Sequence, residues 1–284
     1  MRTSQTRRQG QIFDLSQIQR RIGVARSAWS WSGGRHGEPR QVQRNRTISR
    51  PGNGWFWVHP PATVKSRDTV ALTGQLFGSL FSRATAVQLK ADQVLFLVGD
   101  NGDGCYRVEE GLLKVTMISR DGNERILAFL GPGAIVGEMS IIDQLPRCAS
   151  VVAVRASALS FLNRTDFVDF AKKHSQVYES LLTLLAGRLR ETDTTIAAGT
   201  FLPLRGRLAC TLLELAEEFG QDVGSGRIVI RQKISQKDVA AMAGIARENV
   251  SRIFNDWKRR KLLSQLSGYY CIENKAHLLN EAHL

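Results

Sequence analysis

The chain has few cysteines, and none of them is spaced as a ligand pair. Cys105, Cys148, Cys210 and Cys271 lie far apart, with no Cys-x-x-Cys pair and no histidine at ligand spacing. Structural zinc sites and cysteine-bound clusters need closely spaced ligands. The sequence therefore predicts no metal site, and it favours reduced thiols of the kind found in the cytoplasm.

Long apolar runs are also missing. The longest, such as residues 126–136, contain Gly and Pro and fall short of the ~20 residues that a membrane-spanning helix needs. The N-terminal residues lack the continuous apolar run of a secretory signal. With 284 residues, 43% hydrophobic and 23% charged, the composition fits two globular domains. We expect a cytoplasmic protein with no membrane partner.

Acidic residues are scarce at the start of the chain. Residues 1–50 contain eleven arginines and only Asp14 and Glu38, so most of the formal charge of +13 lies there. Residues 1–66 also lack apolar periodicity, which predicts a disordered extension. A nonspecific nucleic-acid arm and an extension without a role fit this composition better than an organellar transit peptide.

Short segments with period-two alternation follow, separated by Gly, Asp and Pro. A brief helical pattern at residues 68–81 leads into them. The clearest turn is Arg120-Asp121-Gly122-Asn123, between two alternating segments. Regularly spaced short strands with such turns predict an antiparallel β-roll or sandwich over residues 67–170.

The stretch 174–199 has a different period. Its apolar or small residues are spaced alternately by four and three, at Tyr178, Leu182, Leu185, Leu189, Thr192 and Ile196. This spacing is typical of a two-stranded coiled coil, although an ordinary amphipathic helix with a tolerated Thr remains an alternative. We predict a dimerisation helix over residues 171–200. The row becomes more polar near its end, where it contains Thr192 and where Arg188 and Asp193 each lie one residue away from it, which suggests a ligand there.

A helix-turn-helix pattern dominates residues 201–284. Ser235 can cap a helix that ends at Gly244, and a second helix then buries apolar residues at helical spacing. The other face of this second helix carries Arg and Glu. In a major groove, Arg can donate two hydrogen bonds to guanine, and Glu can accept one from the amino group of cytosine. A hairpin-like wing follows Lys261. The predicted DNA-binding residues are Ser235, Gln236, Arg247, Glu248, Asn249, Ser251 and Arg252.

Several basic residues lie near this pattern. They are available for DNA phosphates, and they are Arg205, Arg207, Lys237, Lys258, Arg259, Arg260 and Lys261. A winged-helix module that binds proteins, with a merely solvated charged face, is the alternative to DNA binding.

One stretch of the roll departs from simple alternation. Gly137, Glu138 and Met139 form a glycine-opened turn, and Arg147 and Cys148 follow nine residues later. Backbone amides together with a returning Arg can bind a phosphate, and Glu138 can accept from sugar hydroxyls. A glycine turn beside an unrelated surface Arg would give the same bare pattern.

From about Thr69 to the end, the order of roll, GEMS…PRCAS, long helix and ARENVSR resembles the Crp/Fnr family of bacterial transcription regulators. The resemblance implies that the cyclic phosphate and ribose bind at Gly137, Glu138, Met139, Arg147 and Cys148. It likewise implies that Arg188, Thr192 and Asp193 face the base. Cys148 stands where the family has a hydroxyl residue, and Asp193 where it has Ser, so one phosphate hydrogen bond and the base preference are open.

The resemblance also bears on cofactors. The iron–sulfur branch of the family uses an N-terminal cysteine cluster, which this sequence lacks. The haem branch uses a histidine near the phosphate cradle, the name used here for residues 137–148, and residues 137–152 contain no histidine. We expect a cyclic nucleotide, cyclic AMP rather than cyclic GMP, as the effector. We expect no metal, haem or iron–sulfur cluster.

Together these observations predict an α+β protein with a cyclic-nucleotide-binding-like roll, a dimerisation helix and a winged helix-turn-helix. The expected partners are a palindromic DNA operator, a second copy of the chain and RNA polymerase. No Ser-His-Asp, paired-carboxylate or P-loop arrangement follows residue 201, so we expect no enzyme activity. Two alternatives stay open: a regulator of this fold that does not bind cyclic nucleotides, and a regulatory module of an enzyme complex.

Overall fold

The computed structural model describes residues 76–283. The predicted extension at residues 1–66, and most of the helical pattern predicted at residues 68–81, lie outside this range. Residues 76–80 are helical and continue into the short 3-10 helix η1 (Phe81–Arg83). The end of that helical pattern is therefore confirmed.

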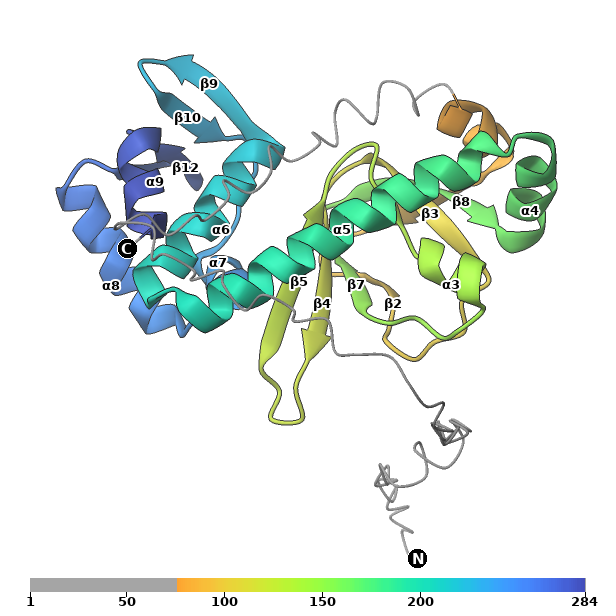
Figure 1. Ribbon diagram of the computed structural model, residues 1–284, viewed down its shortest axis with the longest axis horizontal. Coiled ribbons are helices and arrows are strands. Elements are labelled where there is room, and N and C mark those ends of the chain that lie inside the picture. The colour runs from red at the N-terminus through yellow and green to blue at the C-terminus, as the bar shows by residue number, and fades with distance from the viewer. Residues whose placement is uncertain (1–75, 284) are drawn as a thin grey trace, which may run out of the picture. The chain divides into compact units, whose positions relative to one another are not determined.

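A roll of two four-stranded antiparallel sheets follows (Figure 1). The first sheet has the order β1-β8-β3-β6 and the second the order β2-β7-β4-β5. The strands are β1 (Thr85–Leu89), β2 (Val94–Phe96), β3 (Gly104–Glu110), β4 (Leu113–Ile118), β5 (Glu124–Leu130), β6 (Ile135–Val136), β7 (Ser150–Ala153) and β8 (Ser157–Asn163).

The predicted turn between β4 and β5 is confirmed. Gly122 has φ +79°, a conformation that a residue without Cβ adopts at little cost, and the Ser119 amide donates to the Asn123 carbonyl at 2.9 Å. Between the sheets, inward-facing residues such as Val108 and Leu113 are fully buried. Alternation of apolar and polar residues along each strand produces this core.

Three helices accompany the roll: α3 (Glu138–Asp143), α4 (Arg164–Lys173) and α5 (Gln176–Phe201). Asn163 begins α4, because its side chain accepts from the Asp166 amide at 2.8 Å. Helix α5 confirms the predicted long helix but begins at Gln176, because residues 171–173 belong to α4. It buries Val177 and Leu181 in a cluster with residues of the roll and α4. Much of the predicted apolar row on α5 faces outward and is exposed.

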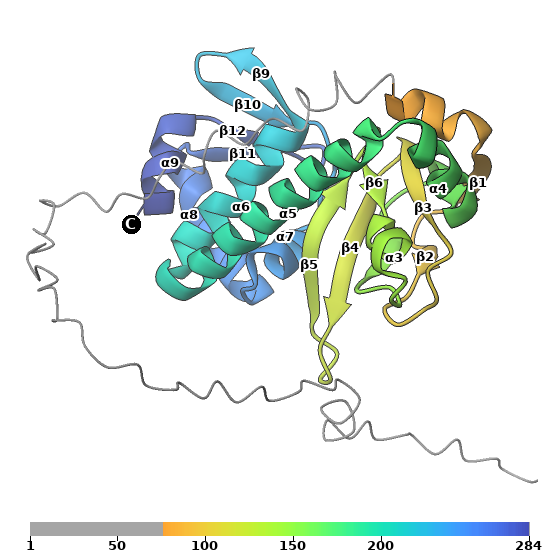
Figure 2. The ribbon, with the colours of Figure 1, turned by 45° about the vertical axis from the view of Figure 1, so that its right-hand side comes forward.

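The C-terminal part combines four helices and four strands. They are α6 (Leu204–Phe219), β9 (Gly220–Gly224), β10 (Arg227–Ile230), α7 (Gln236–Ala243), α8 (Arg247–Arg259), β11 (Leu263–Leu266), β12 (Tyr269–Ile272) and α9 (Lys275–His283). The strands form one sheet in the order β11-β12-β10-β9. Phe254 and Trp257 of α8 are fully buried in its core, as their helical spacing predicts. Helix α6 packs against α9 and also contacts α8, and Figure 2 shows the three helices together. The α+β fold with a winged helix-turn-helix is confirmed.

Three elements were not predicted: α3, β9 and α9. Helix α9 does carry a signal, since Asn274 accepts from the His277 amide at 3.0 Å, and Leu278 and Ala282 are spaced four apart and buried. Strand β9 is mostly exposed, so it has no apolar alternation that a sequence reading could detect.

Among residues 76–283, no helix is both long and apolar enough to cross a membrane. The same residues contain no group of three or more His, Cys, Asp or Glu side chains placed to hold a metal ion.

Candidate functional site

Gly137 joins β6 to α3 in a left-handed conformation, with φ +83°. A Cβ at this position would lie 2.4 Å from Nη1 of Arg147, well inside contact distance. Glycine is therefore required both by the backbone angle and by the close approach of a guanidinium group.

Arg147 is built into the interior of the roll, with only 4% of its surface exposed. Its Nη1 donates to the Gly137 carbonyl at 2.8 Å, and Nη2 lies 3.7 Å from Oδ1 of Asp103. The guanidinium stacks on Phe96, 4.4 Å from the ring centroid. Its Nε is buried without a hydrogen-bond partner. The interpretation of this residue as an unrelated surface Arg is wrong.

Glu138 opens α3 and is also buried, with 2% exposure. One carboxylate oxygen pairs with Nη1 of Arg188 on α5, and Nη2 of Arg188 donates to the Ile135 carbonyl at 2.5 Å. The other oxygen of Glu138, Oε2, is buried without a partner. The structure thus brings two predicted ligand residues into contact with each other and ties the central helix to the cradle.

Met139 and Cys148 lie at the edge of this cradle. Both are exposed, and Sγ of Cys148 lies 3.7 Å from Sδ of Met139. By contrast, Cys105 is buried, and burial raises the pKa of its thiol to about 12. Cys148 is the cysteine that solvent reaches most freely.

Thr192 and Asp193 are not brought to the cradle within one chain. Both are exposed on α5, and Oγ1 of Thr192 donates to the Arg188 carbonyl one turn back, at 2.9 Å. They lie on or beside the exposed apolar row of the helix. For Thr192 or Asp193 to contact a ligand in the cradle, α5 must move closer to the cradle, or these residues must come from a second chain.

The helix-turn-helix is held by local side-chain bonds. Ser235 caps α7, accepting from the Asp238 amide at 3.1 Å. Ser251 of α8 donates to Oε1 of Gln236 at 2.9 Å, so two predicted DNA-binding residues link the two helices. Gly244 ends α7 with φ +64°. The cap and the glycine turn are confirmed.

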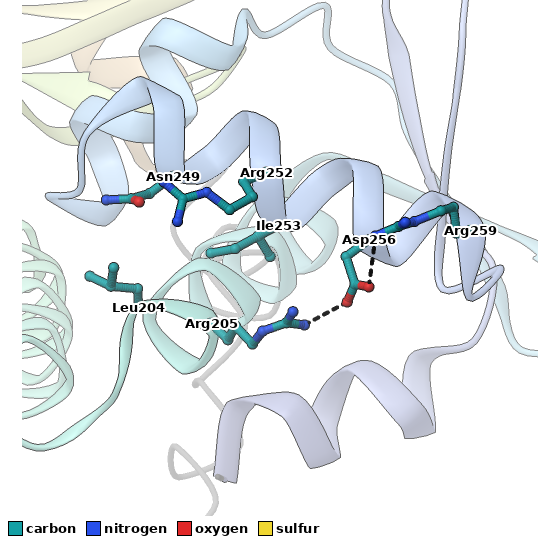
Figure 3. A pocket seen from close by; sticks show the side chains of 7 residues that line it. All are labelled: Leu204, Arg205, Asn249, Arg252, Ile253, Asp256 and Arg259. Atoms are coloured by element: carbon teal, nitrogen blue, oxygen red, sulfur yellow. Dashed lines mark hydrogen bonds and ion pairs between the residues drawn. The ribbon is translucent and has the colours of Figure 1, made fainter.

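The outer face of α8 is polar and accessible. Arg247, Glu248 and Arg252 are exposed, and Asn249 is partly buried. Asn249 and Arg252 line a groove of about 440 Å³ between α8 and the start of α6 (Figure 3). Of the predicted base-reading residues, Asn249 and Arg252 therefore lie at this groove, whereas Arg247 and Glu248 are exposed at the start of α8.

Arg207, which the sequence offered for phosphates, is engaged within the helix-turn-helix. Its Nη2 donates to the Ala243 carbonyl at 3.1 Å and also to the Gly244 carbonyl, so the guanidinium closes the end of α7. A cation near the last carbonyls of a helix is stabilising. Arg207 thus fixes the turn, and its use for a phosphate stays a prediction.

Helix α7 also contacts the β4–β5 hairpin of the roll. Lys114 pairs with Glu124 at 2.7 Å and with Asp238 of α7 at 3.5 Å. Arg125 donates to the Ala241 carbonyl at 3.5 Å, and burial, together with the nearby Arg207, lowers the pKa of Arg125. The hairpin and the helix-turn-helix are therefore in direct contact.

Comparison with known proteins identifies two regions. Residues 86–174 match the family described as the cyclic nucleotide-binding domain, and residues 206–281 match the Crp-like helix-turn-helix domain. The first match contains the cradle from Gly137 to Cys148, and the second contains α7 and α8.

Relatives cover both regions. Over 219 residues the chain is 30% identical to a CRP-like cAMP-activated global transcriptional regulator of Mycobacterium tuberculosis, covering 77% of this chain and 91% of the relative. It is 37% identical over 161 residues to the cyclic AMP receptor protein of Thermus thermophilus, covering 57% and 71%. The structure of a CRP/FNR-family transcriptional regulator from Thermus thermophilus superposes with a TM-score of 0.58 at 25% identity, covering 70% and 99%.

The Glu138–Arg188 contact generates a stability prediction. Arg188→Ala leaves a buried carboxylate unpaired, which costs ~3–5 kcal/mol in a fully buried pair. Because the Arg188 side chain is 33% exposed, we expect a smaller loss, about 2 kcal/mol, measured by chemical denaturation. The double variant Glu138→Gln/Arg188→Ala should recover part of the loss, since it leaves no unpaired charge. A double variant no more stable than Arg188→Ala would contradict the pairing. The control is Lys172→Ala, which breaks an exposed ion pair and should change the stability little.

Proposed function

The chain belongs to the Crp/Fnr family of transcription regulators, and from this premise we propose that it is a homodimer whose affinity for a palindromic DNA operator is controlled by cyclic AMP. As a member, it is a DNA-binding regulator with a cyclic nucleotide-binding domain. The observation that carries the effector part is the buried Arg147 in the cradle opened by Gly137.

The cradle fits a cyclic nucleotide. Arg147 uses Nη1 for the Gly137 carbonyl, and a guanidinium has five N–H donors, so donors remain for a cyclic phosphate. Two buried polar atoms without partners, Nε of Arg147 and Oε2 of Glu138, are the kind of groups that a ligand satisfies. We assign the effector site to residues Gly137, Glu138, Met139, Arg147, Cys148, Arg188, Thr192 and Asp193.

Cyclic AMP is favoured over cyclic GMP because the names of both curated relatives refer to cyclic AMP. Met139 and Cys148 would border the nucleotide, with the Cys148 thiol as a weaker donor than a hydroxyl. Asp193 could accept a hydrogen bond from an adenine amino group. The exposed positions of Thr192 and Asp193 on α5 are compatible with a contact made from the other subunit.

The exposed row on α5 supports the homodimer. Leu182, Leu189 and Ile196 are 66%, 62% and 62% exposed in the single chain. Burying a leucine or isoleucine side chain contributes ~1.5–3 kcal/mol. These three residues recur every seven positions, a spacing that suits a partner helix of the same kind. A second α5 would cover this row and complete the seam.

The outer face of α8 supports major-groove reading. Arg247 and Arg252 can bind guanine, Asn249 can bind adenine, and Glu248 can accept from cytosine. In a two-fold dimer the two α8 helices would enter successive grooves about 34 Å apart. We assign DNA contacts to Ser235, Gln236, Arg247, Glu248, Asn249, Ser251 and Arg252. RNA polymerase in the cytoplasm is the further partner that this function implies.

We also propose the domain limits. Residues 67–170 form the effector domain, 171–200 the dimerisation segment and 201–284 the DNA-binding domain, after a basic extension at 1–66. Effector contacts to Arg188 would shift α5 and with it the DNA-binding domain beyond Phe201. A coupling of ~1–3 kcal/mol between effector and DNA is typical of such systems.

A regulator of the same family that answers to another signal is the second candidate. Cys148 at the position of a hydroxyl residue favours it, and so does the Glu138–Arg188 pair, because it leaves a ligand only one oxygen of Glu138, Oε2. Calorimetric titration with cyclic nucleotides decides between the two candidates.

For the effector site, we expect full-length protein to bind cyclic AMP in calorimetry and Arg147→Gln to lose that binding. The amide retains hydrogen bonding but removes the charge that neutralises the phosphate. Arg120→Gln, at the exposed hairpin turn, is the matched control and should bind as the wild type does. Retained binding by a folded Arg147→Gln protein would refute the cradle, and no heat with any cyclic nucleotide would favour the second candidate.

For the dimer, we expect Leu182→Glu to shift the protein from dimer to monomer in sedimentation equilibrium. A carboxylate in the seam would be desolvated without a partner. The control is Thr183→Glu, which adds the same residue at the next exposed position, outside the seam. A Leu182→Glu dimer as stable as the wild type would place the dimer interface elsewhere.

A further inference from the structure

The groove beside α8 is lined by seven residues, three of which are arginines. Arg205 comes from α6, and Arg252, Arg259 and the carboxylate of Asp256 come from α8 (Figure 3). At about 440 Å³ it has room for a phosphodiester group. Three guanidinium groups line it against the carboxylate of Asp256, and a second carboxylate, Glu281, is shared by Arg205 and Arg260. The balance of charge stays positive, which suits an anion.

Arg205 lies in the first turn of α6 and reaches across the groove. Its Nη1 donates to Oδ2 of Asp256 at 2.8 Å and lies 3.7 Å from Oε2 of Glu281. Both contacts use the same nitrogen, so the other N–H donors of the fork can serve a further oxygen. The hydrogen bond from Arg205 lowers the pKa of Asp256. Asp256 is therefore ionised, and the arginines paired with it offset its negative charge. This reduces its repulsion of an incoming anion.

Glu281 anchors this arrangement from the C-terminal helix α9. It is only 5% exposed, and its Oε1 accepts from Nη1 of Arg260 at 2.5 Å. A buried carboxylate is unfavourable unless it is paired, and Glu281 is shared by two arginines.

The approach of α9 to α6 is itself tight. A Cβ at Gly206 would lie 3.4 Å from the Glu281 carbonyl and 3.3 Å from Cβ of Leu202. Leu278 and Ala282 of α9 are buried in the same core as α6. The backbone at Glu281 is therefore fixed relative to the start of α6.

We infer that the groove between α6 and α8 binds a backbone phosphate of DNA through Arg205, and that Glu281 is the positioning residue that holds Arg205 for this contact. The inference rests on the proposed DNA binding. The ligand class is a nucleic-acid phosphodiester, read without regard to base sequence. Restraining a flexible side chain before binding reduces the entropy lost in the complex.

The test measures full-length protein binding to a random-sequence DNA duplex by fluorescence anisotropy over a range of salt concentrations. No operator or effector is required, and the basic residues 1–66 are the same in every variant. Each phosphate contact contributes about 0.9 to the slope of log K against log salt. We expect Arg205→Ala to lower the slope by about that amount. Arg227→Ala, which removes an equal charge paired with Glu273, should lower it much less.

The positioning role is tested by a double-variant cycle. Glu281→Gln should weaken duplex binding about two- to fivefold, the range expected for an ion pair of ~0.5–1 kcal/mol. The effect should largely disappear in the Arg205→Ala background, because Glu281 acts through Arg205. Glu273→Gln is the matched control. If thermal melting shows Glu281→Gln to be unfolded, Glu281→Asp, which keeps the charge but withdraws it from Arg205, takes its place in the cycle.

Three outcomes would overturn the inference. If the salt slope of Arg205→Ala equals that of Arg227→Ala, Arg205 does not contact a phosphate. If the Glu281 variant loses the same duplex affinity with Arg205 present and with Arg205→Ala, Glu281 does not act through Arg205 and has only a structural role. Absence of duplex binding by the wild-type chain would contradict the proposed DNA-binding function itself, which the first two outcomes leave intact.

Discussion

The contact between Glu138 and Arg188 connects the parts of this structure. Glu138 is buried in the first turn of α3, and Arg188 reaches it from α5 while also donating to the Ile135 carbonyl. A buried carboxylate requires such a partner, so the position of α5 depends on the cradle. One oxygen of Glu138, Oε2, has no partner, so a ligand that binds there would contact the same carboxylate as Arg188. The helix that bears Arg188 also carries the exposed apolar row.

Beyond the C-terminal end of α5, polar contacts hold helix α7 of the DNA-binding domain in place. Arg207 closes the end of α7 at Ala243 and Gly244, and Lys114 joins the β4–β5 hairpin to Asp238. The roll therefore meets the helix-turn-helix directly as well as through α5. A movement of α5 would have to be accommodated by this second contact, since packed interfaces switch between discrete arrangements rather than deforming continuously.

Local patterns made much of this structure predictable. Ser235 and Gly244 bound α7, and the spacing of Val250, Phe254 and Trp257 set the buried face of α8, because caps and periodicity act over a few residues. Contacts between distant residues could not be predicted in the same way. Arg188 and Glu138 are 50 positions apart, and the role of Glu281 depends on α9, whose short pattern attracted no prediction. The residues of the cradle were identified, but the burial of Arg147 required the structure.

The central claim is that effector binding and DNA binding are coupled, and the most direct measurement is the affinity of the full-length protein for an operator selected from random sequences, with and without saturating cyclic AMP. A coupling of ~1–3 kcal/mol predicts an affinity about 5- to 150-fold higher with the nucleotide. Equal affinities in the two conditions, with cyclic AMP demonstrably bound, would contradict the claim.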